Sequence, residues 1–135
     1  MTSPVRSTLL CLAIAGAIVA GCGGSGKPGY CSSLNNLKNS IQAVPSTNVV
    51  QGGTNALKSA VTKVENDAKA VVSSAKSDFP NETSALSNSI DALTTSVKAL
   101  ANNPSAAGVA QTVSDVSAVS TAVKNFSSAA SSKCG

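Results

Sequence analysis

Hydrophobic side chains between residues 34 and 130 recur at alternating spacings of three and four, the repeat of one face of an α-helix. The alternation with period two that marks a half-buried strand is absent from these segments. The repeat is interrupted at Pro45, at Phe79-Pro80 and at Asn102-Asn103-Pro104, where a proline ring lacks the backbone donor that a helix interior needs. The pattern therefore predicts four helices joined by short breaks.

Each predicted helix carries one series of core positions. The sequence does not decide whether Val49-Val50 already belong to the second helix, because Gly52-Gly53 would weaken the interior of a helix that began there. The four series are Leu34, Leu37, Ile41 and Val44; Leu57, Val61, Val64, Ala68, Val71 and Ala75, continued by Phe79; Leu86, Ile90, Leu93, Val97 and Leu100; and Val109, Val113, Val116, Val119, Val123, Phe126 and Ala130.

The polar residues at the ends of these segments agree with helix boundaries. Ser32 or Ser33 can cap a first helix over about residues 32–44. Pro80 suits the first turn of the third helix, and the fourth is expected to begin near Ser105. In the fourth helix, Asp115 toward the start and Lys133 at the end match the helix dipole.

Four such segments predict an all-α fold, an antiparallel up-down-up-down four-helix bundle. With an even number of alternating helices, the first begins and the fourth ends at the same end of the bundle. At 1.5 Å per residue the first helix is about 20 Å long and the second and fourth are near 40 Å. We therefore expect the long helices to overhang the first, with part of their apolar seams left for loops, a ligand or a partner.

The N-terminal segment has the order of a secretory signal peptide: Arg6, an apolar run from Leu9 to Ala20, then small residues. The run is shorter than the ~20 apolar residues that a membrane span needs. It closes with Val19-Ala20-Gly21-Cys22, which resembles the lipobox of bacterial lipoproteins. The sequence predicts a cleaved signal peptide over residues 1–21, a flexible lipidated tether over 22–30 and a helical bundle domain over 31–135.

The resemblance to bacterial lipoproteins implies a thioether-linked diacylglycerol on Cys22 and usually an amide-linked acyl chain such as palmitate. Two or more chains make anchoring stable, so the expected location is the extracytoplasmic face of the cell membrane. Lipobox and composition together resemble the small Ala-, Ser- and Thr-rich helical lipoproteins of actinobacteria, including mycobacteria. That likeness implies a place in the cell envelope and no particular activity.

The four cysteines predict one disulfide. Cys11 lies in the signal peptide and Cys22 is the lipidation site, which leaves Cys31 and Cys134 in a compartment where disulfides persist. Closing a loop of about 100 residues contributes roughly 4–5 kcal/mol in the chain-entropy model. The alternatives are two free thiols or a metal pair, and two cysteines without histidine make a poor metal site.

The amino-acid composition indicates that the fold needs the stability that a disulfide would add. The aromatic residues are Tyr30, Phe79 and Phe126, and a core of Ala, Val and Leu buries little area per residue. Nine lysines against six acidic residues are too mild and too scattered to suggest nucleic acid. Lys58, Lys69 and Lys76 share one stripe, which we interpret as a solvated face, with Glu65 placed to pair with Lys69, rather than as a surface for lipid headgroups.

The chain offers little catalytic chemistry. It has no histidine, its carboxylates are spread out, and the Ser59/Lys63 pair is expected to be ordinary helix surface. Residues 21–27 read G-x-x-x-x-G-K, but no strand precedes them, the motif straddles the cleavage point, and Pro28 replaces the hydroxyl residue of a P-loop. We expect no enzyme, no catalytic residue, no cofactor and no metal site.

Two functions remain open from the sequence. In the first, the protein is a non-enzymatic interaction or adaptor module, anchored to the membrane and facing an unidentified protein of the cell envelope. In the second, it is a carrier that holds a lipid or another apolar ligand between its helices. A roomy internal cavity would favour the carrier, whereas a packed core with an exposed apolar strip would favour the adaptor.

Overall fold

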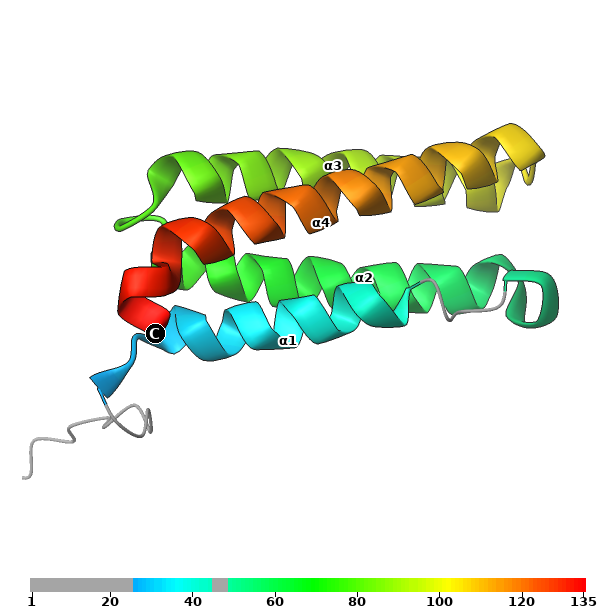
Figure 1. The fold of residues 1–135 in the computed structure, drawn as a ribbon. Coiled ribbons are helices and arrows are strands. Elements are labelled where there is room, and N and C mark those ends of the chain that lie inside the picture. Colours follow the sequence, from blue (N-terminus) through cyan, green and yellow to red (C-terminus); the bar gives the residue numbers. More distant parts are fainter. Residues whose placement is uncertain (1–25, 45–48) are drawn as a thin grey trace, which may run out of the picture.

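The computed structural model describes residues 26–44 and 49–135. Within these residues it consists of four helices and contains no strand: α1 (Gly29–Ala43), α2 (Val49–Ala75), α3 (Pro80–Asn102) and α4 (Ala106–Cys134). Successive helices run in opposite directions and lie side by side (Figure 1). The predicted antiparallel up-down-up-down four-helix bundle is confirmed.

The core is formed by the positions that the first three hydrophobic series predicted. Every residue of these series between Leu34 and Leu100 is buried, except Phe79, which is half-buried at the α2–α3 turn. In α4 the prediction holds from Val119 onward, where Val119, Val123, Phe126 and Ala130 are buried. It is wrong for Val109 and Val113, which are exposed, whereas Val116 is half-buried and packs against the core.

The helix ends follow local chemistry. Pro80 opens α3, where it needs no hydrogen-bond donor, and Glu82 lies in the first turn. Ser105 caps α4, with its Oγ accepting from the Gly108 amide nitrogen at 3.0 Å. Gly53 interrupts the beginning of α2 with a φ of 65°, which only glycine adopts readily. The regular part of α2 therefore begins after Gly53.

The first helix begins earlier than predicted. α1 starts at Gly29, so residues 29–30 belong to the bundle and not to the tether, and Ser32 and Ser33 lie inside the helix instead of capping it. The reason is Tyr30, which is 2% exposed and packs into the core, so that its burial draws one more turn into the helix. Pro28 is the residue before the helix, and its carbonyl accepts from the Cys31 amide at 3.0 Å.

The unequal helix lengths have the predicted consequence. α1 has 15 residues and α4 has 29, which correspond to about 22 Å and 43 Å. Both meet at the end of the bundle where α1 begins, so α1 covers only part of α4 (Figure 1). The α1–α4 seam is consequently the least extensive of the four between neighbouring helices.

Candidate functional site

The predicted disulfide is present and closes one end of the bundle. Cys31 in the first turn of α1 is bonded to Cys134, the last residue of α4, with their Cα atoms 5.5 Å apart. Cys31 is buried and Cys134 is partly buried against the core. Lys27, just before α1, donates from Nζ to the Gly135 carbonyl oxygen at 3.4 Å. We call this the stapled end, and the chain enters the bundle there.

The three aromatic side chains of the protein meet beside the staple. The ring of Phe79 lies 5.7 Å from that of Tyr30 and 5.3 Å from that of Phe126, all in edge-on geometry. Tyr30 and Phe126 are 6.3 Å apart. Burial raises the pKa of Tyr30, and the negative charge of Asp78 adds to the effect. This cluster supplies at one end the large apolar surface that the Ala- and Val-rich core lacks elsewhere.

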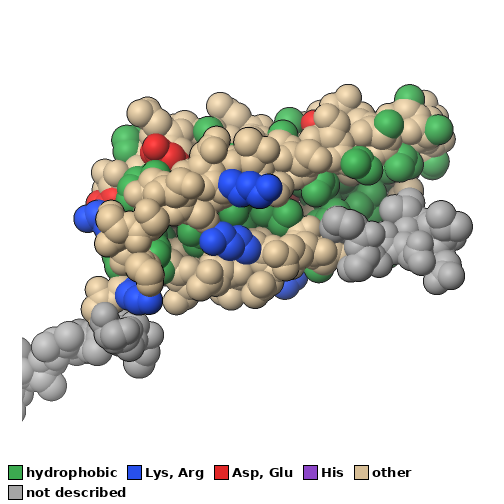
Figure 2. Space-filling model, in the orientation of Figure 1, with side chains coloured by type: hydrophobic (Ala, Val, Ile, Leu, Met, Phe, Trp, Pro, Cys, Tyr) green, Lys and Arg blue, Asp and Glu red, His purple; other side chains and the backbone are tan. Residues whose placement is uncertain are grey.

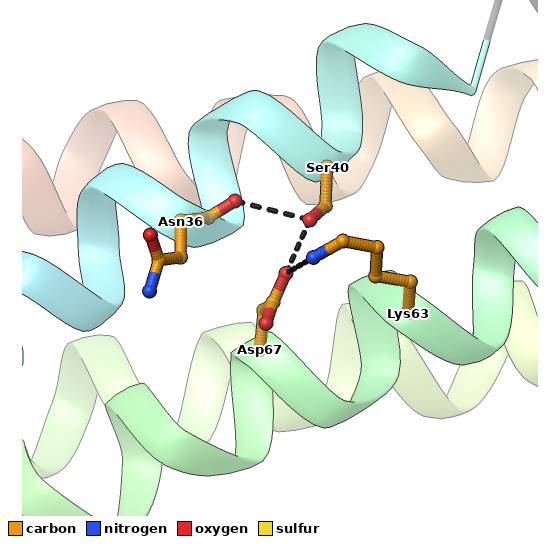
Figure 3. A network of polar contacts seen from close by, with 4 residues as sticks. All are labelled: Asn36, Ser40, Lys63 and Asp67. Carbon is orange, nitrogen blue, oxygen red and sulfur yellow. Dashed lines mark hydrogen bonds and ion pairs between the residues drawn. The ribbon is translucent and has the colours of Figure 1, made fainter.

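A polar network joins α1 to α2 (Figure 3). The Ser40 hydroxyl contacts Oδ2 of Asp67 and lies 3.0 Å from the Asn36 carbonyl oxygen. The same Asp67 oxygen accepts from Lys63 Nζ at 2.9 Å. Burial alone would raise the pKa of Asp67, but the hydrogen bonds from Ser40 and Lys63, with the lysine charge, lower it below its ordinary value.

An equivalent network joins α3 to α4. Ser96 donates its hydroxyl hydrogen to Oδ2 of Asp115, and Gln111 Nε2 donates to Oδ1 at 3.0 Å. Asp115 is 8% exposed and lies beyond the first turn of α4. The prediction that it complements the helix dipole is therefore wrong, because its carboxylate is bound by side chains between two helices.

The two networks share one design, and the sequence carries a signal of it. The segments 37–43 and 93–99 both read L-x-x-S-I/V-x-A, and the long polar donors Lys63 and Gln111 each stand four residues before the aspartate that they bind. Each hairpin of the bundle thus has a serine on its first helix bound to an aspartate on its second. These contacts fix the register of helix on helix, since a slip would leave a carboxylate buried without its donor.

The predicted solvated stripe on α2 is ordinary surface. Lys69 Nζ pairs with Glu65 Oε1 at 2.6 Å, as the spacing predicted, with the lysine side chain 70% exposed. Such a pair contributes only about 0.3–0.5 kcal/mol. Lys63 binds Asp67, so its ammonium is engaged by a carboxylate and not by Ser59.

A hollow of about 340 Å³ lies on the outer surface between α2 and α3, near the α2–α3 turn. It is open to solvent and is lined by Lys76, Ser84 and Asn88 among other mostly polar residues.

Among the described residues, no group of three His, Cys, Asp or Glu could hold a metal ion. None of the helices within residues 26–44 and 49–135 is long and apolar enough to cross a membrane.

The largest exposed apolar side chains of the described residues lie on α4, at the end of the bundle opposite the stapled end. Val113 is 61% exposed and Val109 is 36% exposed, and the neighbouring Val116 is half-buried and packs partly against the core. We call these three residues the distal stripe. In Figure 2 hydrophobic side chains gather at this end, whereas the visible lysines lie nearer the middle and the stapled end.

Polar residues replace these valines on the inner face of α4. Thr112 and Asp115 are 3% and 8% exposed, and the Thr112 hydroxyl donates to the Gly108 carbonyl oxygen at 2.9 Å. The inner and outer faces are one residue apart, which is about 100° around the helix. At this level α4 therefore turns polar side chains inward, with Asp115 bound by Ser96 of α3, and leaves Val109 and Val113 exposed.

Cys22, the predicted lipidation site, and the rest of the lipobox lie outside the described residues. Comparison of the chain with family models, with curated proteins and with solved structures found no match.

Proposed function

We propose that this protein is a lipoprotein, anchored through Cys22 to the extracytoplasmic face of the cell membrane, which acts as a non-enzymatic interaction module. The observation that carries the interaction role is the distal stripe, because valines exposed along one helix face are typical of a surface that meets a partner. The bundle holds this stripe at the end opposite to the one at which the chain enters. An anchor at Cys22 would thus direct the stripe away from the membrane.

The disulfide supports the extracytoplasmic location, and the short tether would keep the bundle near the membrane. The Cys31–Cys134 disulfide is a bond that persists in oxidising compartments and is rare in the cytosol. Gly26, the first described residue, is only four residues after Cys22, a distance that an extended chain spans with at most about 14 Å. The stapled end would therefore lie close to the lipid surface.

The packing favours the interaction module over the carrier. The aliphatic side chains that face the middle of the bundle are buried, and those of Leu37, Leu86 and Val71 have no exposed surface. The hollow between α2 and α3 is an open groove, whereas a site for an apolar ligand is enclosed and lined by large apolar groups.

The anchor is tested by Cys22→Ala in the full chain, expressed in a bacterium that processes lipoproteins. We expect the wild type in the membrane fraction with the mass of a lipid-modified residue 22, and the variant released from it. Cys11→Ala is the matched control, because Cys11 lies in the segment removed on processing and its change should leave retention intact. Retention of the Cys22→Ala protein in membranes would refute the anchor.

A further inference from the structure

We propose that the distal stripe pairs with the distal stripe of a second copy of this chain, so that two anchored molecules associate in parallel along α4. The inference deepens the proposed function and rests on it, since it names the partner of the exposed surface. Three observations carry it: the spacing of the valines, the charge around them, and the position at which the chain enters the bundle. The size of the stripe sets how strong the association is.

The spacing suits a helix of the same sequence. Val109 and Val113 are exposed four residues apart, and Val116, three residues further on, packs partly against the core. A spacing of four and three residues is that of the seam between two helices packed side by side with a small crossing angle. In a parallel pair around a twofold axis, each residue of the seam faces its own counterpart. The small side chains nearby, such as Ala106 and Ala110, leave room for the two helices to approach.

The charge distribution permits self-pairing on this face. Between Lys98 and Lys124 the sole charged residue is Asp115, which is buried and bound by Ser96 and Gln111. Two copies of the face therefore meet without like charges. The α1–α2 side carries four lysines against two acidic residues, so pairing there would bring positive charge against positive charge.

The place at which the chain enters the bundle excludes the N-terminal tether as the occupant and sets the direction of pairing. Val113 is 21 residues before Cys134 on α4, or about 31 Å from the stapled end. Residues 22–25 of an anchored chain reach at most about 14 Å, so the protein's own tether cannot cover its stripe. Because both copies are held at their stapled ends by one membrane, their α4 helices point the same way and pair in parallel.

The size of the stripe makes the association weak in solution. A stable interface buries about 800 Å² per partner, which two exposed valines and their small neighbours do not supply. Membrane anchoring favours association despite the small contact area, because molecules confined to one surface meet at a high effective concentration. We therefore expect a dimer on the membrane that dissociates when the protein is diluted in detergent.

Cysteine crosslinking in membranes tests this arrangement in the full chain. In the processed protein Cys22 carries lipid and Cys31 is bonded to Cys134, so Val109→Cys and Val113→Cys each add the single free thiol. Under mild oxidation both should form disulfide-linked dimers, because counterparts on a parallel seam lie within the ~7 Å between Cα atoms that a disulfide allows. The matched control is Ala118→Cys, which is exposed and about 140° around α4 from Val113. We expect about tenfold less dimer from it.

A charged variant provides the second measurement. Val113→Lys in the Val109→Cys background should lower the dimer yield about tenfold, because it opposes two positive charges across the seam. Ala118→Lys in the same background should leave the yield unchanged. Both lysines are on exposed positions, so thermal unfolding should be unchanged and loss of fold cannot explain a lost crosslink.

Three outcomes of the crosslinking experiment would contradict the proposal. Equal crosslinking at 113 and 118 would mean random collision, and a crosslinked product with a different protein would show another occupant. A dimer from Val113→Cys without one from Val109→Cys would indicate antiparallel pairing. Membrane retention of the same samples reports the anchor separately. If the chain proves soluble the anchor fails, and the crosslinking ratio measured at about 100 µM still decides whether α4 self-associates.

Discussion

Breaking the staple should remove a large share of the protein's stability. Cys31 and Cys134 are 103 residues apart in sequence, so their bond closes nearly the whole bundle into one loop. In the chain-entropy model this contributes about 4.7 kcal/mol at 25 °C. The free energy of unfolding of a small domain is only about 5–15 kcal/mol, and the core here is built mostly from Ala, Val and Leu.

The assay is urea unfolding of the domain that begins at Gly26, followed by circular dichroism in its oxidised and reduced forms. With an m-value of about 1.5 kcal/mol/M, the loss corresponds to a midpoint lower by about 3 M after reduction. Cys31→Ser/Cys134→Ser should unfold at the reduced midpoint and should not respond to reductant. A drop smaller than about 1 M would refute the reasoning, because the unfolded chain would then retain the closeness of its ends without the bond.

Three further changes probe the core, the polar network and the backbone. Phe126→Ala should lower the free energy of unfolding by about 3–5 kcal/mol, because Phe126 is fully buried against Tyr30 and Phe79; Val113→Ala, on the exposed stripe, should change it by less than about 0.5 kcal/mol. Asp67 has a lowered pKa in the folded protein, so its contribution to stability is present above about pH 4 and is lost as the pH falls through the folded value. Ser40→Ala removes a hydrogen bond that lowers this pKa, and urea midpoints should then depend less on pH between about 5 and 2, whereas Ser89→Ala, which loses only a bond to the Ala85 carbonyl, should leave the profile unchanged. Gly53→Ala should lower stability by about 1 kcal/mol, because φ there is 65°, while Gly29→Ala, in helical backbone with open space for a Cβ, should raise the melting temperature slightly.

Sequence reasoning predicted most of the bundle because each helix repeats its apolar positions without ambiguity. In α2 and α3 the four-three spacing leaves a single apolar stripe, so the buried face is determined before any neighbour is known. The prolines at 80 and 104 mark where helices begin or end, whatever packs on them. The pairing of Cys31 with Cys134 followed from elimination and from the parity of four alternating helices.

The beginning of α1 and the Ser–Asp networks could not be predicted in the same way. In the sequence, Tyr30 follows a glycine-rich segment and resembles the end of a tether. Its ring is buried because it packs against Phe79 and Phe126, which are distant in the chain. Ser40 and Asp67 are polar residues on two separate helices, and only the contact of α1 with α2 brings them together. Their recurrence as Ser96 and Asp115 is visible in the sequence only after the contact has been seen once.

The sequence by itself therefore determined which segments are helical and where they end, because these depend on local backbone chemistry and on a period of 3.6 residues. It also determined which sulfurs join, because only two cysteines remain for the helical domain and four alternating helices bring them to the same end. Only the tertiary structure decided which of two neighbouring stripes of α4 is the inner one. Those stripes are about 100° apart, and the choice depends on the contacts that α4 makes with its neighbouring helices, which the local sequence of α4 does not specify. Asp115 is bound by Ser96 of α3, and Val109 and Val113 are exposed.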